Sequence, residues 1–173
     1  MNEELYHYGV KGMKWGVRHD RKNSESYSIT TKNNDKLVFE RNKGGALGRA
    51  LGKISPKIKK EQENTYNYLI KDSKGRTVGD YQMYRKSPDE MNMVWGSVKK
   101  KYRGRGYMTA MMEQGEKIAK KYGAKKLTGE VVGNSPDMQH IVDKKDYKKV
   151  GEIRTQEMLD IWGGLTLIEK DLK

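Results

Sequence analysis

Cysteine is absent from this 173-residue chain, and proline and phenylalanine are scarce, at three residues and one. The lack of cysteine excludes disulfides, thiolate-bound metals and a cysteine nucleophile. No apolar run is long enough to cross a bilayer, and no secretory signal peptide is recognisable. We therefore expect a soluble protein made in a cytoplasm. A hydrophobic share of 34% and a mean hydropathy of −1.01 predict a lean core and a charged surface.

Positive charge is in large excess, with 36 Lys and Arg against 23 Asp and Glu and a net charge of +13. Such a charge attracts polyanions, whether nucleic acid, an anionic surface or a phosphorylated cofactor. No recognisable nucleic-acid-binding motif accompanies it, which favours a solvated basic face. The lysines gather in four runs, at residues 57–60, 99–101, 120–126 and 144–149.

The first 26 residues differ from the rest. The segment YHYGVKGMKWGVR, residues 6–18, mixes aromatic, glycine and basic residues without helix or strand periodicity. It resembles a short N-terminal motif of proteins encoded in phage and prophage structural gene regions. Our hypothesis is that this segment docks the protein to a phage structural protein, in the cytoplasm of a bacterial host or in the virion. We expect a tag and linker over 1–26 and one domain over 27–173.

The domain is organised around residues 93–123, where a strand pattern is followed by a helix pattern. Residues 93–98 form a short apolar run typical of a buried strand, and from residue 108 apolar side chains recur at helical spacing. Arg103, Gly104, Arg105 and Gly106 lie between them. A helix start offers unpaired N–H groups and partial positive charge, glycines let a phosphate approach, and arginines add forked donors. The joint is therefore a candidate phosphate site, although a basic turn without a ligand is the alternative.

The other patterns predict an α+β domain. Alternation of apolar and polar residues predicts two hairpins, over 27–40 and 66–84, whose turns lie at 33–35 and 72–75. Further strands are expected at 126–132, 148–153 and 164–172, and further helices at 44–54, 57–62 and 136–145. We expect residues 44–63 and 154–163 to be the substrate-facing segments.

The run VKKKYRGRGYM, residues 98–108, resembles motif A of the GNAT N-acetyltransferases, which is Arg/Gln-x-x-Gly-x-Gly/Ala after a strand. Arg103 and Gly106 match the pattern, and Met108 stands where a small residue is usual. The blocks DYKKVGEI and GLTLIEKDL extend the resemblance, which covers about 27–173. It implies a mixed, mostly antiparallel central sheet flanked by helices, with a splayed central strand pair.

The resemblance also implies acetyl-CoA as the cofactor. In the family the loop amides hold the pyrophosphate, the splay admits the pantetheine arm, and a main-chain N–H on the central strand binds the oxyanion. The positions implied for this chain are Val98, Arg103, Gly104, Arg105, Gly106, Tyr107, Met108 and Asn134. No group of metal-ligating residue types predicts a metal site.

Acyl transfer to an amine also needs a base for the ammonium and a proton for the leaving thiolate. Glu130 is the candidate base, and Asp89 and Glu90 are rivals. A charged side chain on a strand is also commonly just solvent-facing.

Many family members protonate the thiolate with a tyrosine about seven residues after the asparagine, where this chain has Val142. His140 and Tyr147 are the candidates to replace it. The alternatives are a solvent-facing helix residue for His140 and a packed aromatic at a strand start for Tyr147.

Three functions remain open from the sequence. The first is a phage-encoded acyl-CoA-dependent N-acetyltransferase acting on an unknown amine. The second is a phage virion or morphogenesis protein that uses a catalytically reduced GNAT fold as a structural or binding module. The third is a basic nucleic-acid-binding protein whose loop holds backbone phosphates, with polyanions as non-specific partners.

Overall fold

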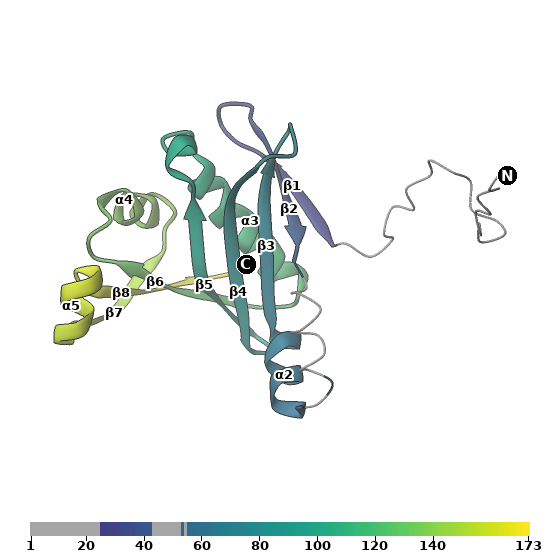
Figure 1. Cartoon of the computed structure of the whole chain (residues 1–173). Coiled ribbons are helices and arrows are strands. Elements are labelled where there is room, and N and C mark those ends of the chain that lie inside the picture. The colour runs from purple at the N-terminus through teal and green to yellow at the C-terminus, as the bar shows by residue number, and fades with distance from the viewer. Residues whose placement is uncertain (1–24, 43–52, 54) are drawn as a thin grey trace, which may run out of the picture.

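The computed structural model describes residues 25–42, 53 and 55–173. These residues form an eight-stranded sheet with the order β1-β2-β3-β4-β5-β6-β8-β7 (Figure 1). All neighbours run antiparallel except β5 and β6, which are parallel. The strands are β1 Ser26–Thr30, β2 Lys36–Arg41, β3 Thr65–Asp72, β4 Thr77–Ser87, β5 Glu90–Val98, β6 Lys126–Val132, β7 Lys148–Ile153 and β8 Leu165–Asp171. The expected α+β fold with a mixed, mostly antiparallel sheet is confirmed.

The longest helix covers one face of the sheet. This helix, α3 (Tyr107–Lys121), runs behind β3, β4 and β5 in Figure 1, and α2 (Pro56–Asn64) lies at the lower end of β3. The other helices are the short 3₁₀ turn η1 Lys100–Tyr102, α4 Pro136–Lys144 and α5 Gln156–Trp162. No described helix is long and apolar enough to cross a membrane.

The two middle strands separate part of the way along. β5 pairs with β6 only from Glu90 to Met93, opposite residues 126–129, while its other edge stays paired with β4 up to Val98. The β4–β5 register slips between Gln82 and Met83, which face Trp95 and Met93, so Val94 is an extra residue in β5. A bulge of this kind bends a strand and increases its twist. The bend turns the end of β5 away from β6 and opens a split in the sheet.

Helix α3 packs very closely on β4. Met111, Ile118 and Ala119 are fully buried on the face of α3 that contacts the sheet. Between them Gly115 leaves room for the buried Tyr81, because a methyl group at Gly115 would overlap the Tyr81 hydroxyl. The Tyr81 hydroxyl has no hydrogen-bond partner in the described structure. This contact sets the distance between α3 and the sheet, and with it the position of the loop before α3.

Most expected elements are confirmed, including both hairpins, the polar helix over 57–62 and the helix starting at Pro136. No helix is predicted from the sequence over the substrate-facing segment 154–163, which is wrong, because this segment contains α5. Thr155 caps that helix by accepting a hydrogen bond from the Met158 amide, and Gly163 ends it with φ of 67°. The expected helix over 44–54 lies almost entirely outside the described residues.

Candidate functional site

The loop between β5 and α3 presents a row of free amides. No hydrogen bond within the described chain engages the backbone N–H groups of residues 104–109; the first paired amide of the helix is that of Ala110, which donates to the Gly106 carbonyl at 3.1 Å. Gly106 stands at the N-cap with φ of 73°, and Gly104 has φ of 75°. Added methyl groups at either glycine would meet nothing within 4 Å, so open space lies over both. Free amides and the positive end of a 15-residue helix make this a strong position for an anion.

Two side chains of the loop are turned away from that space. The Arg103 guanidinium donates from Nε to the Val98 carbonyl at 3.1 Å, which ties the loop to the end of β5. Met108 lies against β5, because a methyl group at Gly96 would meet its sulfur at 3.4 Å. Met108 therefore packs on the strand, and the absence of a side chain at Gly96 leaves the room that its larger side chain needs.

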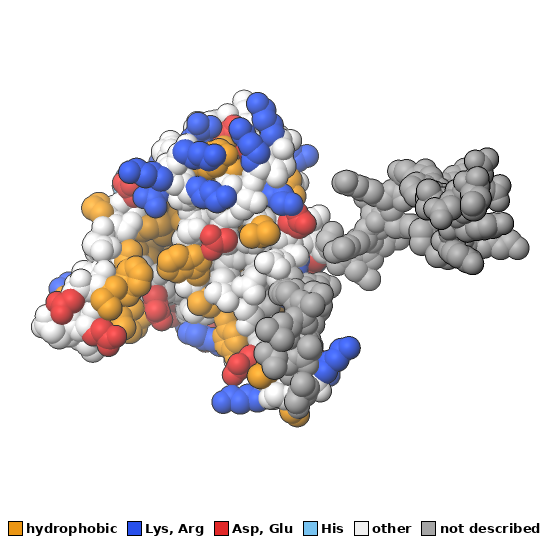
Figure 2. Space-filling model, in the orientation of Figure 1, with side chains coloured by type: hydrophobic (Ala, Val, Ile, Leu, Met, Phe, Trp, Pro, Cys, Tyr) orange, Lys and Arg blue, Asp and Glu red, His pale blue; other side chains and the backbone are white. Residues whose placement is uncertain are grey.

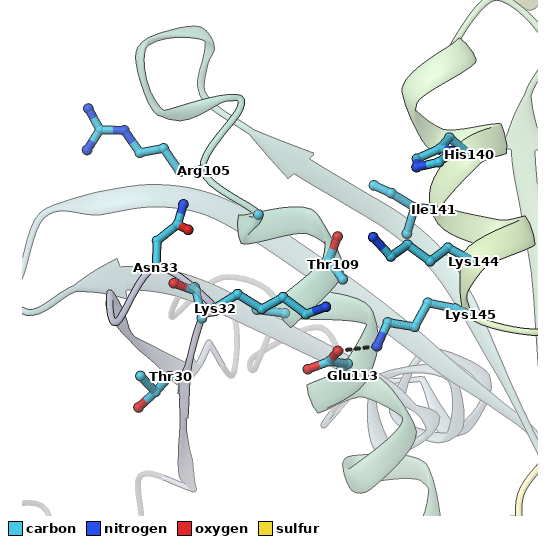
Figure 3. A pocket seen from close by; sticks show the side chains of 13 residues that line it. Thr30, Lys32, Asn33, Arg105, Thr109, Glu113, His140, Ile141, Lys144 and Lys145 are labelled. Atoms are coloured by element: carbon cyan, nitrogen blue, oxygen red, sulfur yellow. Dashed lines mark hydrogen bonds and ion pairs between the residues drawn. The ribbon is translucent and has the colours of Figure 1, made fainter.

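A basic cavity continues from the loop along the outer side of α3 (Figure 3). It has a volume of about 460 Å³ and lies between the β1–β2 turn, the first two turns of α3, and α4. Lys32, Lys144 and Lys145 extend into it towards Thr109, whereas Arg105 lies at the rim and points away. Lys145 is paired with Glu113. Lys32 and Lys144 form no ion pair with any described residue, so both charges are free for an anionic ligand.

Comparison with known proteins identifies the family to which this chain belongs. The profile of the Acetyltransferase (GNAT) family matches residues 54–144, which is more than half of the chain. The chain belongs to the GNAT acetyltransferase family. Residues 1–22 match a family of unknown function (DUF7211), so the phage resemblance of residues 6–18 stays a prediction. A search of curated proteins found no match.

Solved GNAT structures share the fold at low sequence identity. A GNAT family acetyltransferase from Elizabethkingia anophelis with acetyl-CoA bound is 15% identical, with a TM-score of 0.61 over 79% of this chain and 98% of that chain. The IAA acetyltransferase from Bacillus cereus is 17% identical, with a TM-score of 0.62 over 79% and 99%. An acetyltransferase from Bacillus subtilis in complex with CoA is 14% identical, with a TM-score of 0.58 over 69% and 84%.

Two of the predicted site residues, Asn134 and His140, lie beside the split and the basic cavity respectively. The backbone amide of Asn134 donates to the Trp162 carbonyl at 3.0 Å, so α5 fixes the turn after β6, and the Asn134 side chain is exposed. His140 is exposed on α4 and lines the basic cavity next to Lys144. His140 is therefore on the same side of the sheet as the loop between β5 and α3.

Tyr147 lies in a buried polar group at the base of the split. It is 5% exposed, and its hydroxyl donates to Glu116 at 3.0 Å and lies 3.9 Å from the Met93 sulfur. Lys170 donates to the same Glu116 at 3.0 Å. Burial, together with the Glu116 charge, raises the pKa of Tyr147 well above its ordinary value.

Glu130 lies on β6 just beyond the last residue that pairs with β5, so it flanks the opening of the split. Its side chain is exposed and has no partner in the described structure. Its rivals are both engaged: Asp89 pairs with Lys125 at 3.3 Å, and Glu90 with Lys86 at 3.3 Å. The structure thus leaves Glu130 as the free carboxylate among the three, while its role as base stays a prediction.

Proposed function

We propose that this protein is an N-acetyltransferase that binds acetyl-CoA through the loop 103–108 and transfers the acetyl group to an amine. The observation that carries the proposal is the row of unpaired amides over 104–109, which opens into free space beside a split sheet. A pyrophosphate can satisfy several of these N–H groups at once, and the helix dipole adds to the attraction. The split gives a thioester a route from that loop to the other face of the sheet.

The basic cavity supports the same cofactor. The nucleotide end of CoA carries a further phosphate, and Lys32 and Lys144 supply unpaired charges a short way along α3 from the loop. The amides of residues 104–109 would hold the pyrophosphate, and Val98, at the end of β5, would lie beside the pantetheine arm. The Asn134 side chain, free at the far side of the split, is a further candidate contact.

Bound acetyl-CoA supplies an activated thioester. The chain must bring an amine to it, take a proton from the incoming ammonium and deliver a proton to the departing thiolate. Glu130 is the proposed base because it is unpaired and flanks the split. Tyr147 and His140 remain the proposed proton donors, and Tyr147 is the better supported, because its hydroxyl lies near Met93, where the two strands part.

The phage-related role is kept as a second proposal. The segment 6–18 would dock the protein onto a phage structural component, in the host cytoplasm or the virion, and the GNAT domain would then be a binding module. A nucleic-acid-binding function is less well supported, because Lys32 and Lys144 line a cavity.

Calorimetric titration with acetyl-CoA tests the proposed function. We expect saturable binding to the full chain and no detectable binding after Gly106→Glu, because the new carboxylate would occupy and repel the pyrophosphate position. Gly123→Glu is the matched control, since Gly123 has a similar φ of 81° with open space around it, at the other end of α3. Absence of binding by the wild-type protein, or equal loss in both variants, would overturn the proposal.

A further inference from the structure

The face of the sheet turned away from α3 carries an unusual set of side chains at the split. Met83 and Tyr81 are buried against α3, so the alternating residues of β4, Asp80 and Gln82, point to the opposite face. Across the strand pair Asp80 faces Ser97 and Gln82 faces Trp95. Trp95 is 49% exposed, which is high for a large aromatic side chain in a central strand.

Three lysines on the strands of this face are paired with carboxylates, whereas Lys36, at the exposed start of β2, has no ion-pair partner among the described residues. Within the described strands Lys71 pairs with Glu40, Lys86 with Glu90 at 3.3 Å, and Lys126 with Glu169 at 3.0 Å. Figure 2 shows the same face: basic side chains crowd its upper edge, while hydrophobic, uncharged and a few acidic side chains lie in its middle.

Two carboxylates of this face have no cationic partner. Asp80 is half-buried and accepts a hydrogen bond from the Ser97 hydroxyl, and it forms no ion pair with any described residue. Glu130 is also unpaired, on the other side of the split. In a chain with a net charge of +13, a half-buried carboxylate left without a cation has unused capacity to bind one.

The two carboxylates are offset along the strands. Glu130 follows Gly129, which pairs with Met93, whereas Asp80 pairs with Ser97 further along β5. With the bulge at Val94 taken into account, the offset is two or three residues, roughly 7–10 Å at ~3.3 Å per residue. Trp95 lies between these two levels. A ligand that reaches both carboxylates must therefore carry two positive groups several carbon atoms apart.

We propose, on the basis of the proposed function, that the acceptor is an aliphatic amine with a second positive charge, and that Asp80 binds this second charge. The reacting amine lies at the split near Glu130, and the carbon chain crosses Trp95, whose ring also attracts cations. The Ser97 hydroxyl holds the Asp80 carboxylate in place. Asp80 is thus a specificity-determining residue that acts on the acceptor and has no part in binding acetyl-CoA.

The test compares two acceptors that differ only in the second charge, 1,5-diaminopentane and n-pentylamine, at neutral pH. With the wild-type protein we expect the kcat/KM for acetylation of the diamine to be at least tenfold higher than for the monoamine. In Asp80→Asn, which keeps the shape and the Ser97 contact, this ratio should fall to near one through loss of the diamine rate alone. Asp171→Asn, at the exposed end of β8, is the control and should keep the ratio.

Two binding measurements separate this proposal from the proposed function. Asp80→Asn should bind acetyl-CoA as tightly as the wild type, which also shows that it is folded. Calorimetry with 1,5-diaminopentane alone should give at least tenfold weaker binding to Asp80→Asn than to the wild type, even if no acetylation is seen. Equal diamine affinity in the two proteins, or a substrate ratio that Asp80→Asn leaves unchanged, would overturn the assignment of Asp80, whereas a failure of acetyl-CoA binding would overturn the proposed function.

Discussion

The two faces of the split sheet differ in the polar and charged groups that have no partner within the described structure. On the side of α3 the amides of residues 104–109 and the charges of Lys32 and Lys144 have no partner in the described structure. On the opposite side Lys71, Lys86 and Lys126 are paired with carboxylates, whereas Asp80 and Glu130 have no cationic partner among the described residues. A net charge of +13 alone suggests one polyanion-binding surface. The structure instead gives a face suited to an anionic ligand and a face suited to a cationic one, with the split between them.

The largest effect should come from Gly115→Ala, which disturbs the packing of α3 on the sheet. The added methyl group overlaps the Tyr81 hydroxyl, so α3 must move outward or Tyr81 must leave its position. We expect a loss of about 3 kcal/mol in the free energy of unfolding, in the range of overpacked cores. Urea denaturation measures it, and acetyl-CoA affinity should fall in the same variant because the loop before α3 moves.

The Tyr81→Phe background is the control for that variant. Removing the hydroxyl removes the atom that lies closest to the new methyl group, although the ring carbons remain close. Gly115→Ala should therefore cost clearly less in Tyr81→Phe than in the wild type. An equal cost in both backgrounds would show that the contact between Gly115 and Tyr81 does not set the position of α3.

The second effect concerns the basic cavity. Lys144→Ala should weaken acetyl-CoA binding about tenfold, roughly 1.4 kcal/mol, because Lys144 has no other partner among the described residues and its charge can pair with a cofactor phosphate. The affinity for a cofactor analogue that lacks the 3′-phosphate should change far less. Lys59→Ala, on the exposed helix α2, is the matched control and should leave both affinities as they are. A similar loss for both cofactors would place the 3′-phosphate away from Lys144.

The third effect concerns Tyr147, at the base of the split. Its pKa is raised by burial and by Glu116, so the folded protein keeps the proton at pH values where an unfolded tyrosine, with a pKa of 10.0, loses it. The stabilising contribution is therefore complete below pH 10 and decreases as the pH rises above it. Tyr147→Phe should cost about 1 kcal/mol at neutral pH, from the lost hydrogen bond to Glu116, and should reduce the alkaline loss of stability.

The same variant tests the proposed role of Tyr147 in catalysis. If Tyr147 delivers the proton to the thiolate, kcat should fall at least tenfold in Tyr147→Phe while acetyl-CoA affinity is kept. Unchanged kcat with the stability loss described above would leave Tyr147 as a structural residue only. His140→Gln, compared under the same conditions, shows whether the exposed histidine contributes instead.

Local patterns were enough to predict much of this architecture. Helical periodicity and Gly123 predict α3, and the alternation of apolar and polar residues predicts the hairpins, because these signals depend on neighbouring residues. The short run Arg103–Gly106 marked the loop before α3 as a candidate anion site for the same reason. Helix α5 was missed although Thr155 and Gly163 are ordinary cap signals, since seven residues are too few for a clear period. Asp80 could not be found from sequence, because its significance depends on strand pairing with Ser97 and on a bulge at Val94.

The smallest effect should come from Tyr81→Phe alone. The Tyr81 hydroxyl is buried without a partner in the described structure, and burial raises its pKa, with a further contribution from the Glu116 charge. An unpaired buried hydroxyl costs free energy in the folded state, so its removal should leave stability unchanged or raise it by up to about 1 kcal/mol. Thermal and urea unfolding measure this change. A loss of more than about 1 kcal/mol would mean that the hydroxyl has a partner after all, and that the contact of α3 with the sheet is held by a hydrogen bond as well as by packing.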